Sequence, residues 1–392
     1  MKVCFVCSEY PPGLYGGIGR VTQVLGRALV RAGHEVRVVG VYPASSSAPE
    51  YEEDEGVRVW RMPARSGRLS WMGDRHGLYR RLRSWSEDGL VELIEVPDWD
   101  GLAAYWPALQ VPILTRLHGS MTYFAAELGR AVRPMSRLLE RRSLKRSDFW
   151  CSVTRHVAQV TRRVFQIASE PGAILYNPVE IPVDNTSPGR DPNRAVFTGT
   201  LTWKKGVVSL VKAWSMVKRQ HPDAQLHLFG KDGRIDTGSS MIQYLRGTMD
   251  EQTAKSVHFH GHVSHETIQQ NLMTARLAVF PSYSESFGLA PIEAMVSGCP
   301  TIFTKLTCGP EVLQDGVEGI LVDPDNPSDI ANAILRLLRD DSLAEALGRR
   351  GRAGVTERFS LERLLPCNEK FYQACIEEFR TESNGPGARR RS

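Results

Sequence analysis

The sequence predicts an α/β protein with two Rossmann-like, doubly wound domains, because three features recur along the chain. Short apolar runs alternate with amphipathic segments in both halves, which is typical of a parallel sheet covered by helices. A segment rich in Pro, Asn and Asp, residues 181–194, separates the halves. Glycines and charged residues follow several apolar runs directly, at the edge where open α/β sheets bind ligands. We therefore expect two domains that face a central cleft.

The length of 392 residues fits two domains of ordinary size better than one. We expect a first Rossmann-like domain over residues 1–180, a linker over 181–194 and a second domain over 195–365. A helix over 366–381 is expected to return to the first domain, and a flexible tail to follow over 382–392.

Individual elements follow from the same pattern. Strands are predicted in the first half at residues 3–7, 35–40, 56–61, 91–95, 112–118, 149–153 and 173–176. Strands are predicted in the second half at residues 195–199, 225–230, 257–261, 277–280, 300–303 and 319–322. The clearest helices are predicted at residues 19–32, 206–220, 288–297, 327–340, 343–357 and 361–380.

Composition resembles that of an ordinary soluble globular protein and argues against several other classes. Hydrophobic residues make up 42% and charged residues 24% of the sequence, so each half can bury a core of normal size. The net charge of +5 is too small to indicate a nucleic-acid partner. No apolar run approaches the ~20 residues of a membrane span. Because the first strand begins at once, we expect no signal peptide and a cytoplasmic location.

The cysteines and histidines do not form a recognisable metal motif. The seven cysteines are an odd number without metal-ligand spacing, which fits a reducing compartment. Cys4 and Cys7 lie inside a predicted strand, so we expect them to act as small hydrophobes. His258 and His260 point to one face of a predicted strand, but no third ligand is apparent. We expect no metal and no obligatory cofactor.

The most informative segment contains Glu285 and Glu293. The apolar run 277–280 predicts a buried strand that stops at Pro281, and the pattern over 288–297 predicts a helix. Glu285 is therefore expected on a loop beyond a strand end, and Glu293 on the helix that follows. The helix start offers N–H groups that suit a phosphate. Two carboxylates on either side of a phosphate site suggest that they hold sugar hydroxyls flanking a diphosphate.

A glycine-rich loop follows the first strand, with Gly13, Gly16, Gly17 and Gly19. Glycines let a backbone approach a ligand closely. Their spacing is not G-x-G-x-x-G, and the next strand does not end in an acidic residue, so a dinucleotide site is disfavoured. A tight turn without a ligand is the alternative.

The segment 198–206 opens the second half in the same way, and Lys205 stands at the start of a helix. A cation there can neutralise a departing diphosphate. A solvated lysine would be the simpler explanation of this residue alone. Its position favours function, because this loop and the Glu285 loop both follow strand ends of one domain.

Residues at two strand ends of the first half are further candidates. His118 precedes a glycine, so it could reach a ligand, although a lone histidine is more often structural. Asp98 and Trp99 follow another strand, where they either face a ligand or pack.

Basic residues gather in the stretches 65–83 and 130–146. In the second stretch they recur near helical spacing at Arg130, Arg133, Arg137, Arg141 and Lys145. Such a pattern is most often a solvated helix face. Contact with anionic lipid, and thus a peripheral membrane location through these basic helices, is the alternative.

These residues together resemble glycosyltransferase family 4, the large retaining family with the GT-B fold. The resemblance covers nearly the whole chain and is strongest over residues 196–324. Its motifs are weak singly but specific in this order and context. They are Gly16-Gly17-x-x-Arg20, His118-Gly119, Gly199-x5-Lys205-Gly206, Glu285-x7-Glu293 with Phe287-Gly288, and Gly309-x-Glu311-Val312 followed by Asp315-Gly316 and Gly319-Ile320-Leu321-Val322.

The resemblance implies a role for each matching residue. Glu293 would hold the ribose hydroxyls of a nucleotide, and Glu285 would contact the transferred sugar. Lys205 would neutralise the diphosphate, and His118 would lie beside the sugar and the departing phosphate. Backbone groups would complete the donor site, at Gly16, Gly17, Val263, Phe287, Gly288 and Leu289.

One position departs from the family pattern. The family usually places an arginine where this chain has Thr200, which we count among the donor-binding residues. Neutralisation of the phosphates would then depend more on Lys205, with Lys204 or Arg20 as helpers.

The resemblance thus implies a retaining transfer of sugar from a UDP-, GDP- or ADP-sugar to an acceptor hydroxyl. His118, Lys205 and Glu285 are the expected catalytic residues, and no protein nucleophile is required. The first domain would form the acceptor side, and the acceptor could be a saccharide, a lipid-linked molecule or a small molecule. The alternatives are a GT-B sugar-nucleotide epimerase, a non-catalytic nucleotide-sugar-binding homologue, and a nicotinamide-dependent dehydrogenase, which the glycine spacing disfavours.

Overall fold

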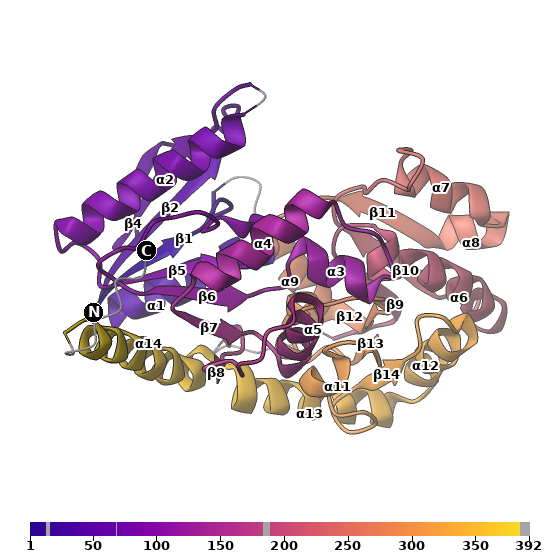
Figure 1. Ribbon diagram of the computed structural model, residues 1–392. Helices are drawn as coiled ribbons and strands as arrows, with labels where there is room; N and C mark the ends of the chain where they lie inside the picture. Colours follow the sequence, from indigo (N-terminus) through magenta and orange to yellow (C-terminus); the bar gives the residue numbers. More distant parts are fainter. Residues whose placement is uncertain (13–15, 68, 183–188, 385–392) are drawn as a thin grey trace. The chain divides into compact units, whose positions relative to one another are not determined.

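The computed structural model describes most of the chain, namely residues 1–12, 16–67, 69–182 and 189–384. The chain forms two compact units (Figure 1). Unit 1 comprises Met1–Glu180 and Phe359–Ser392, and unit 2 comprises Ile181–Arg358. Each unit has a mostly parallel sheet, so the predicted pair of doubly wound α/β domains is confirmed.

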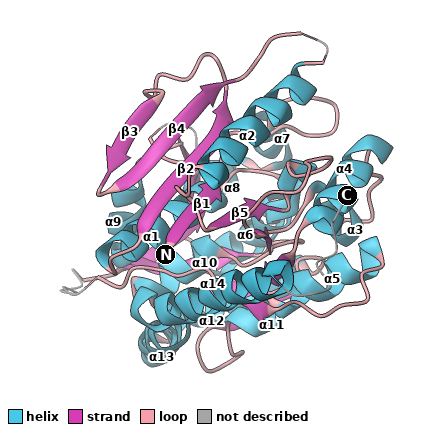
Figure 2. Ribbon diagram, turned by 60° about the vertical axis from the view of Figure 1, so that its left-hand side comes forward, coloured by secondary structure: helices cyan, strands magenta, loops and turns pink. Residues whose placement is uncertain are grey.

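The described part of unit 1 contains an eight-stranded sheet in the order β3-β4-β2-β1-β5-β6-β7-β8, in which β3 pairs antiparallel with β4 (Figure 2). The chain builds the β1, β2 and β4 side first and then crosses to β5, so the order reverses between β1 and β5. Ligands of open α/β sheets bind at such a reversal. The strands are β1 (Lys2–Val6), β2 (Glu35–Tyr42), β3 (Tyr51–Asp54), β4 (Val57–Pro63), β5 (Leu93–Pro97), β6 (Ile113–Leu117), β7 (Phe149–Ser152) and β8 (Ala173–Ile174).

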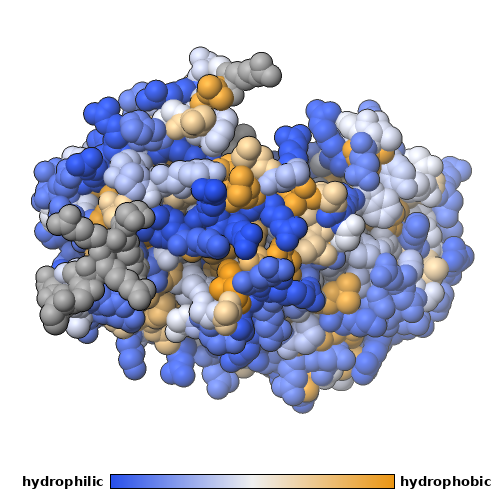
Figure 3. Space-filling view, viewed as in Figure 1, coloured by the Kyte–Doolittle hydropathy of each residue, from blue (hydrophilic) through white to orange (hydrophobic). Residues whose placement is uncertain are grey.

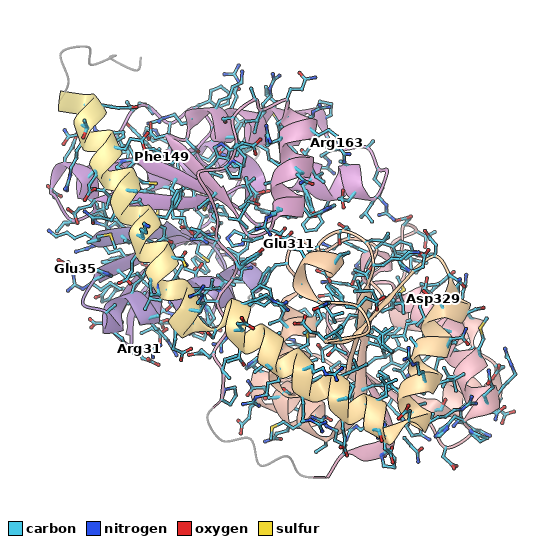
Figure 4. The ribbon with its side chains drawn as sticks, turned by 90° about the horizontal axis from the view of Figure 1, so that it is seen from below. Arg31, Glu35, Phe149, Arg163, Glu311 and Asp329 are labelled. Carbon is cyan, nitrogen blue, oxygen red and sulfur yellow. The ribbon has the colours of Figure 1, made fainter. Side chains whose placement is uncertain are left out.

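Helices cover both faces of the unit 1 sheet. Phe5 and Leu114 pack on one face with Leu25 of α1 and Tyr372 of α14. On the other face, Leu82 of α2 belongs to a second buried cluster. Figure 4 shows α14 lying across the strands of this unit. The helices are α1 (Gly17–Arg31), α2 (Ser70–Glu87), η1 (Trp99–Gly101), α3 (Met121–Glu127), α4 (Pro134–Arg146), α5 (Arg155–Phe165) and α14 (Leu361–Asn384).

A buried polar network ties α14 to the sheet. Arg116 of β6 is 1% exposed and donates to both oxygens of Glu95 of β5, at 2.8 and 3.0 Å. The same guanidinium donates to Asn368 at 2.7 Å and to the hydroxyl of Tyr372 at 2.9 Å. Tyr372 donates its own proton to Glu95 at 2.6 Å. Because each buried polar group needs its partner, the network specifies one position of α14 on the sheet.

The described part of unit 2 contains a parallel six-stranded sheet in the order β11-β10-β9-β12-β13-β14. The chain moves from β9 through β10 to β11 and then crosses to β12, so its reversal point lies between β9 and β12. The strands are β9 (Asp191–Thr198), β10 (Gln225–Phe229), β11 (Val257–Gly261), β12 (Ala275–Phe280), β13 (Thr301–Thr304) and β14 (Ile320–Val322). The helices are η2 (Trp203–Lys205), α6 (Val207–Gln220), α7 (Met241–Thr248), α8 (Glu251–Ser256), α9 (His265–Thr274), α10 (Leu289–Val296), α11 (Gly309–Val312), α12 (Pro327–Arg339) and α13 (Asp341–Phe359).

The beginning of unit 2 differs from the sequence-based boundary. β9 begins at Asp191, inside the expected linker, because Asp191 already pairs with Ala275 of β12. The middle of that linker, residues 183–188, lies outside the described residues.

The end of unit 2 also differs from the expected boundary. Unit 2 ends at Arg358 rather than at 365, because the whole of α14 packs with unit 1. α14 itself continues to Asn384, past the expected end at 381. The remainder of the expected tail, residues 385–392, lies outside the described residues.

Candidate functional site

The loops that follow β9 and β12 are joined by an ion pair at the reversal point of unit 2. Lys205, at the end of η2, places its Nζ 2.6 Å from Oε1 of Glu285. Ser282 donates its hydroxyl proton to the same oxygen at 3.0 Å. Glu285 is only 8% exposed, whereas 25% of the Lys205 side chain reaches solvent. The buried carboxylate therefore holds a partly exposed cation at the carboxyl edge of the sheet.

A glycine permits this close approach of the two loops. Gly206 adopts φ of +69°, and a Cβ there would lie 1.8 Å from the carbonyl oxygen of Pro281. The amide of Tyr283 also donates to the backbone carbonyl of Lys204 at 2.8 Å. A side chain at position 206 would push the loops apart and separate the ion pair.

The N-terminus of α10 follows the Glu285 loop directly. Its N-cap, Gly288, adopts φ of +81° and provides no capping side chain. Among the described residues, none accepts a hydrogen bond from the amides of Gly288 and Leu289. Phe287 is 1% exposed and anchors the turn in the core. Unused N–H groups at a helix start carry a partial positive charge, so this position suits an anion.

Glu293 lies in the second turn of α10, so Glu285 and Glu293 flank the helix start along the chain. Its carboxylate is 25% exposed and lies 3.7 Å from Nδ1 of His265 of α9. Thr200 and Val263 follow the ends of β9 and β11, so the parallel sheet places them at the same carboxyl edge.

The two candidate helper cations have different surroundings. Desolvation and the neighbouring charge of Lys205 lower the pKa of Lys204 to about 8, although Glu285 opposes the shift. Lys204 is therefore mainly charged at neutral pH. Arg20 lies in unit 1, where it donates to Glu180 at 3.0 Å and to Gln23 at 3.1 Å.

A buried aspartate holds the segment of unit 1 that carries His118. Asp98 is 1% exposed, and its two oxygens accept from the amides of His118 at 2.9 Å and Gly119 at 3.1 Å. Desolvation raises the pKa of Asp98 to about 7, although both amides oppose the shift. The sequence left open whether Asp98 faces a ligand or packs. The structure shows that it is buried and fixes the backbone of His118.

The imidazole of His118 is neutral at physiological pH. Its side chain is half-buried at the end of β6, and desolvation together with the nearby Arg116 lowers its pKa to about 3. A neutral ring can donate and accept hydrogen bonds, but it contributes no charge.

The glycine-rich loop of unit 1 accommodates an acid that the sequence did not single out. Oε1 of Glu9 accepts from the amide of Gly19 at 3.0 Å, within the first turn of α1. A Cβ on Gly16 would lie 2.9 Å from Oε2 of Glu9. Gly16 and Gly17 thus lie at a helix end where a carboxylate is already present. Gly13 lies outside the described residues.

The rings of His258 and His260 both contact that of His227 of β10. The ring of His227 is tilted to that of His258, with centroids 4.8 Å apart, and stacked with that of His260, with centroids 5.1 Å apart. Nδ1 of His227 is hydrogen-bonded to Nε2 of His260 at 3.0 Å. No group of three or more His, Cys, Asp or Glu within the described ranges is arranged to hold a metal.

Two further expectations concern the cysteines and membrane spans. Cys4 and Cys7 are buried free thiols, as predicted. None of the helices that the structure describes has both the length and the hydropathy of a membrane span.

The two doubly wound units are those of the GT-B fold, which solved structures of other proteins share. Sucrose-phosphate synthase from Thermosynechococcus elongatus has the same fold, with a TM-score of 0.79, 21% identity and coverage of 96% of this chain and 99% of that one. HepE of Anabaena, solved with UDP and glucose, has a TM-score of 0.73, 16% identity and coverage of 95% and 100%.

Sequence comparisons identify the family. The model for Glycosyltransferase Family 4 matches residues 15–181, and the model for Glycosyl transferases group 1 matches residues 183–354. A glycogen synthase of Mycobacterium tuberculosis is 26% identical over 95% of each chain. The chain belongs to glycosyltransferase family 4, as its motifs predicted.

Proposed function

We propose that the protein transfers a sugar from a nucleoside diphosphate to an acceptor hydroxyl and retains the anomeric configuration. The observation that carries the proposal is the ion pair of Lys205 and Glu285 beside the unused N-terminus of α10. UDP-, GDP- and ADP-sugars all carry the diphosphate that such a site suits. The presence of UDP and glucose in HepE of Anabaena supports UDP as the first nucleotide to test.

The diphosphate is proposed to bind at the start of α10. The amides of Phe287, Gly288 and Leu289 would donate to its oxygens, and Lys205 would supply the counter-charge. Because these groups are held in place before the reaction, they stabilise negative charge as it develops on the leaving group. Lys204 adds a second cation at neutral pH.

The other donor contacts follow from positions along the same sheet edge. Glu293 is proposed to accept hydrogen bonds from the ribose hydroxyls. The backbone at Val263 would line the base, and Thr200 would contact the donor where other family members carry an arginine. Gly16 and Gly17 are proposed to approach the donor through their backbone.

The chemistry requires no protein nucleophile. Oε1 of Glu285 accepts from Lys205 and Ser282, which fixes the orientation of the carboxylate. Glu285 is therefore proposed to orient sugar hydroxyls rather than to attack the anomeric carbon. The bond from the anomeric carbon to the diphosphate breaks while the acceptor oxygen bonds to the same face of that carbon. The acceptor proton passes to the departing phosphate oxygen. The configuration is retained because entry and departure use one face.

His118 is proposed to assist turnover rather than nucleotide binding. Its neutral ring can hydrogen-bond to a sugar hydroxyl without attracting the diphosphate electrostatically. Unit 1 is proposed as the acceptor side. The protein is further proposed to work in the cytoplasm and to contact the inner face of the membrane.

Isothermal titration calorimetry with UDP, GDP and ADP tests the donor site. Glu293→Ala should weaken the best nucleotide about tenfold or more, because hydrogen bonds to a charged group are lost. Glu345→Ala, which removes an exposed acid of α13, is the matched control. His118→Ala should lower kcat while nucleotide affinity stays close to that of the parent. Unchanged affinity of Glu293→Ala for every nucleotide would contradict the proposed site.

A further inference from the structure

Exposed apolar side chains of unit 1 gather at one edge of its sheet. They come from the start of α2, the turn after β5 and the first half of α4. These segments follow the parallel strands β4, β5 and β6, whose carboxyl ends lie at the edge that also holds His118. The residues and their exposed fractions are Met72 (52%), Trp99 (39%), Tyr105 (58%), Met135 (55%) and Leu138 (39%).

Contacts between these segments make them one continuous surface. Arg75 of α2 donates to the backbone carbonyl of Asp100 in the turn. The guanidinium of Arg142 of α4 lies 4.5 Å from the ring centroid of Tyr105. A Cβ on Gly101 would lie 2.3 Å from the backbone of α4, so the turn packs directly on this helix. We call it the α4 surface, formed by Met72, Trp99, Tyr105, Met135, Leu138, Arg137, Arg141, Arg142 and Lys145.

The α4 surface is cationic. The sole acid of α4, Glu140, is 1% exposed and accepts from the amides of Met121 and Thr122, so it does not neutralise the outer face. Arg141 and Lys145 are exposed and form no hydrogen bond or ion pair with any residue that the structure describes. The nearby acid Asp100 interacts with Arg75 of α2 instead. Figure 3 shows hydrophilic and hydrophobic side chains side by side over α4.

We propose that the α4 surface docks the protein on an anionic lipid bilayer. A bilayer can interact with both the cations and the apolar side chains of this surface. Cations attract acidic headgroups, and Trp and Tyr favour the headgroup level. The aliphatic tips of Met135 and Leu138 reach the acyl boundary, as on interfacial helices. A soluble anion would use the arginines but would leave Met72, Met135 and Leu138 in water, and for this reason the bilayer is favoured.

Docking has a consequence for the substrate class, and this consequence rests on the proposed function. The start of α4, with Met135, and the turn with Trp99 lie at the carboxyl edge of the unit 1 sheet that also holds His118, whereas Arg142 and Lys145 lie in the half of α4 that leads back to the start of β7. A docked protein would therefore meet acceptors that are anchored in the bilayer. A lipid-linked saccharide is the acceptor class that this arrangement favours.

Vesicle co-sedimentation tests docking without any need for turnover, so failure of the proposed activity leaves this test intact. The full chain should bind vesicles of equal amounts of phosphatidylglycerol and phosphatidylcholine, and not vesicles of phosphatidylcholine alone. The double variant Arg141→Gln with Lys145→Gln should lower the partition constant about fivefold for each cation removed. Met135→Gln with Leu138→Gln should lower it by a similar factor.

Arg349→Gln with Arg350→Gln is the matched control, because it removes two exposed cations from α13 of unit 2. The partition constant of this variant should stay within about twofold of that of the parent. Unchanged circular dichroism would show that each variant is folded. Absence of binding to the acidic vesicles, or equal losses in the control, would overturn the proposal. Vesicle binding that depends on the cations but not on Met135 and Leu138 would show adsorption through charge alone, without insertion of apolar side chains, and would equally overturn it.

Discussion

The N-termini of α1 in unit 1 and of α10 in unit 2 differ in the acceptors that their amides meet. At α1, the carboxylate of Glu9 accepts from the amide of Gly19 at 3.0 Å. At α10, the amides of Gly288 and Leu289 meet no acceptor among the described residues. The first helix end therefore already holds an anion from the chain itself. The N-terminus of α10 can bind an anion from a ligand, and this helix start follows the loop that holds Lys205.

Glycines after a strand therefore do not by themselves identify a phosphate site. Glycines at both positions allow a close approach of backbone and an oxyanion. The nearest charged side chain decides which oxyanion binds. In unit 1, Glu9 and Asp98 accept from backbone amides near the glycines that follow β1 and β6, whereas in unit 2 the carboxylate of Glu285 holds a cation instead.

Removal of the unit 2 cation should have the largest effect. Lys205→Ala is expected to lower kcat/KM about a thousandfold, because a preorganised charge opposite the leaving diphosphate is lost. Steady-state kinetics would measure it, with Lys212→Ala on the exposed face of α6 as the control. A loss below tenfold in Lys205→Ala would contradict the role assigned to this pair.

The buried network of unit 1 should contribute stability rather than catalysis. Tyr372→Phe removes the hydroxyl that bridges Arg116 and Glu95, and leaving buried partners unsatisfied costs about 2 kcal/mol of unfolding free energy. Urea unfolding would measure the change. Tyr51→Phe, at a 49% exposed ring, is the matched control. Equal stability of the two variants would mean that the network is not needed to hold α14.

The carboxylate of Asp98 should give unit 1 a pH dependence near neutral pH. Below its pKa of about 7, a proton occupies one oxygen, so one of the two amides at His118 and Gly119 loses its acceptor. We expect kcat to fall about tenfold as the pH drops through this value, since a tenfold change corresponds to one lost hydrogen bond. Asp98→Asn should show the low activity at every pH, whereas Asp88→Asn should keep the parent profile. A pH profile of Asp98→Asn that matches the parent would exclude Asp98 as the titrating group.

The same shift determines how Asp98 affects stability. Its folded pKa of about 7 is above the ordinary 3.8, so between these values the folded state binds a proton that the unfolded state has released. The contribution of Asp98 to stability is therefore greatest below pH 3.8 and falls as the pH rises to about 7. Thermal melting of the parent and Asp98→Asn across this range would reveal the difference.

Removal of the Glu9 carboxylate at the N-terminus of α1 should have the smallest effect of these changes. Glu9→Ala removes the acceptor of the Gly19 amide, which should cost about 1 kcal/mol of stability, as loss of a helix cap does. Nucleotide affinity should change little, because the proposed diphosphate site depends chiefly on unit 2. Glu53→Ala on the exposed edge strand β3 is the control. A tenfold change in nucleotide affinity would show instead that the α1 terminus carries a large share of the donor site.

Strands that are buried on both faces could be predicted from the sequence because they are short apolar runs. β12, for example, is buried at every residue. The edge strand β3 could not be predicted in this way, because Tyr51–Asp54 is mostly acidic and alternates between exposed and half-buried positions. The helix α14 was predicted, but its specific anchoring through Arg116 depends on a contact between distant parts of the chain.

The same limit applies to the candidate site. Lys205 and Glu285 could be placed at one sheet edge because both follow strand ends, and the structure joins them at 2.6 Å. The role of Asp98 in holding His118 could not be derived, because the two strands concerned are neighbours only in the folded sheet. Glu9 carries a usable signal, since it is an acid between the first strand and the glycines.

A structure of the protein with its best-binding nucleoside diphosphate would show which helix end binds the donor. Diphosphate oxygens are expected within hydrogen-bonding distance of the Leu289 amide and of Nζ of Lys205, with Glu293 on the ribose. A diphosphate bound at the N-terminus of α1 in place of the Glu9 carboxylate, with the Lys205–Glu285 pair untouched, would contradict this expectation.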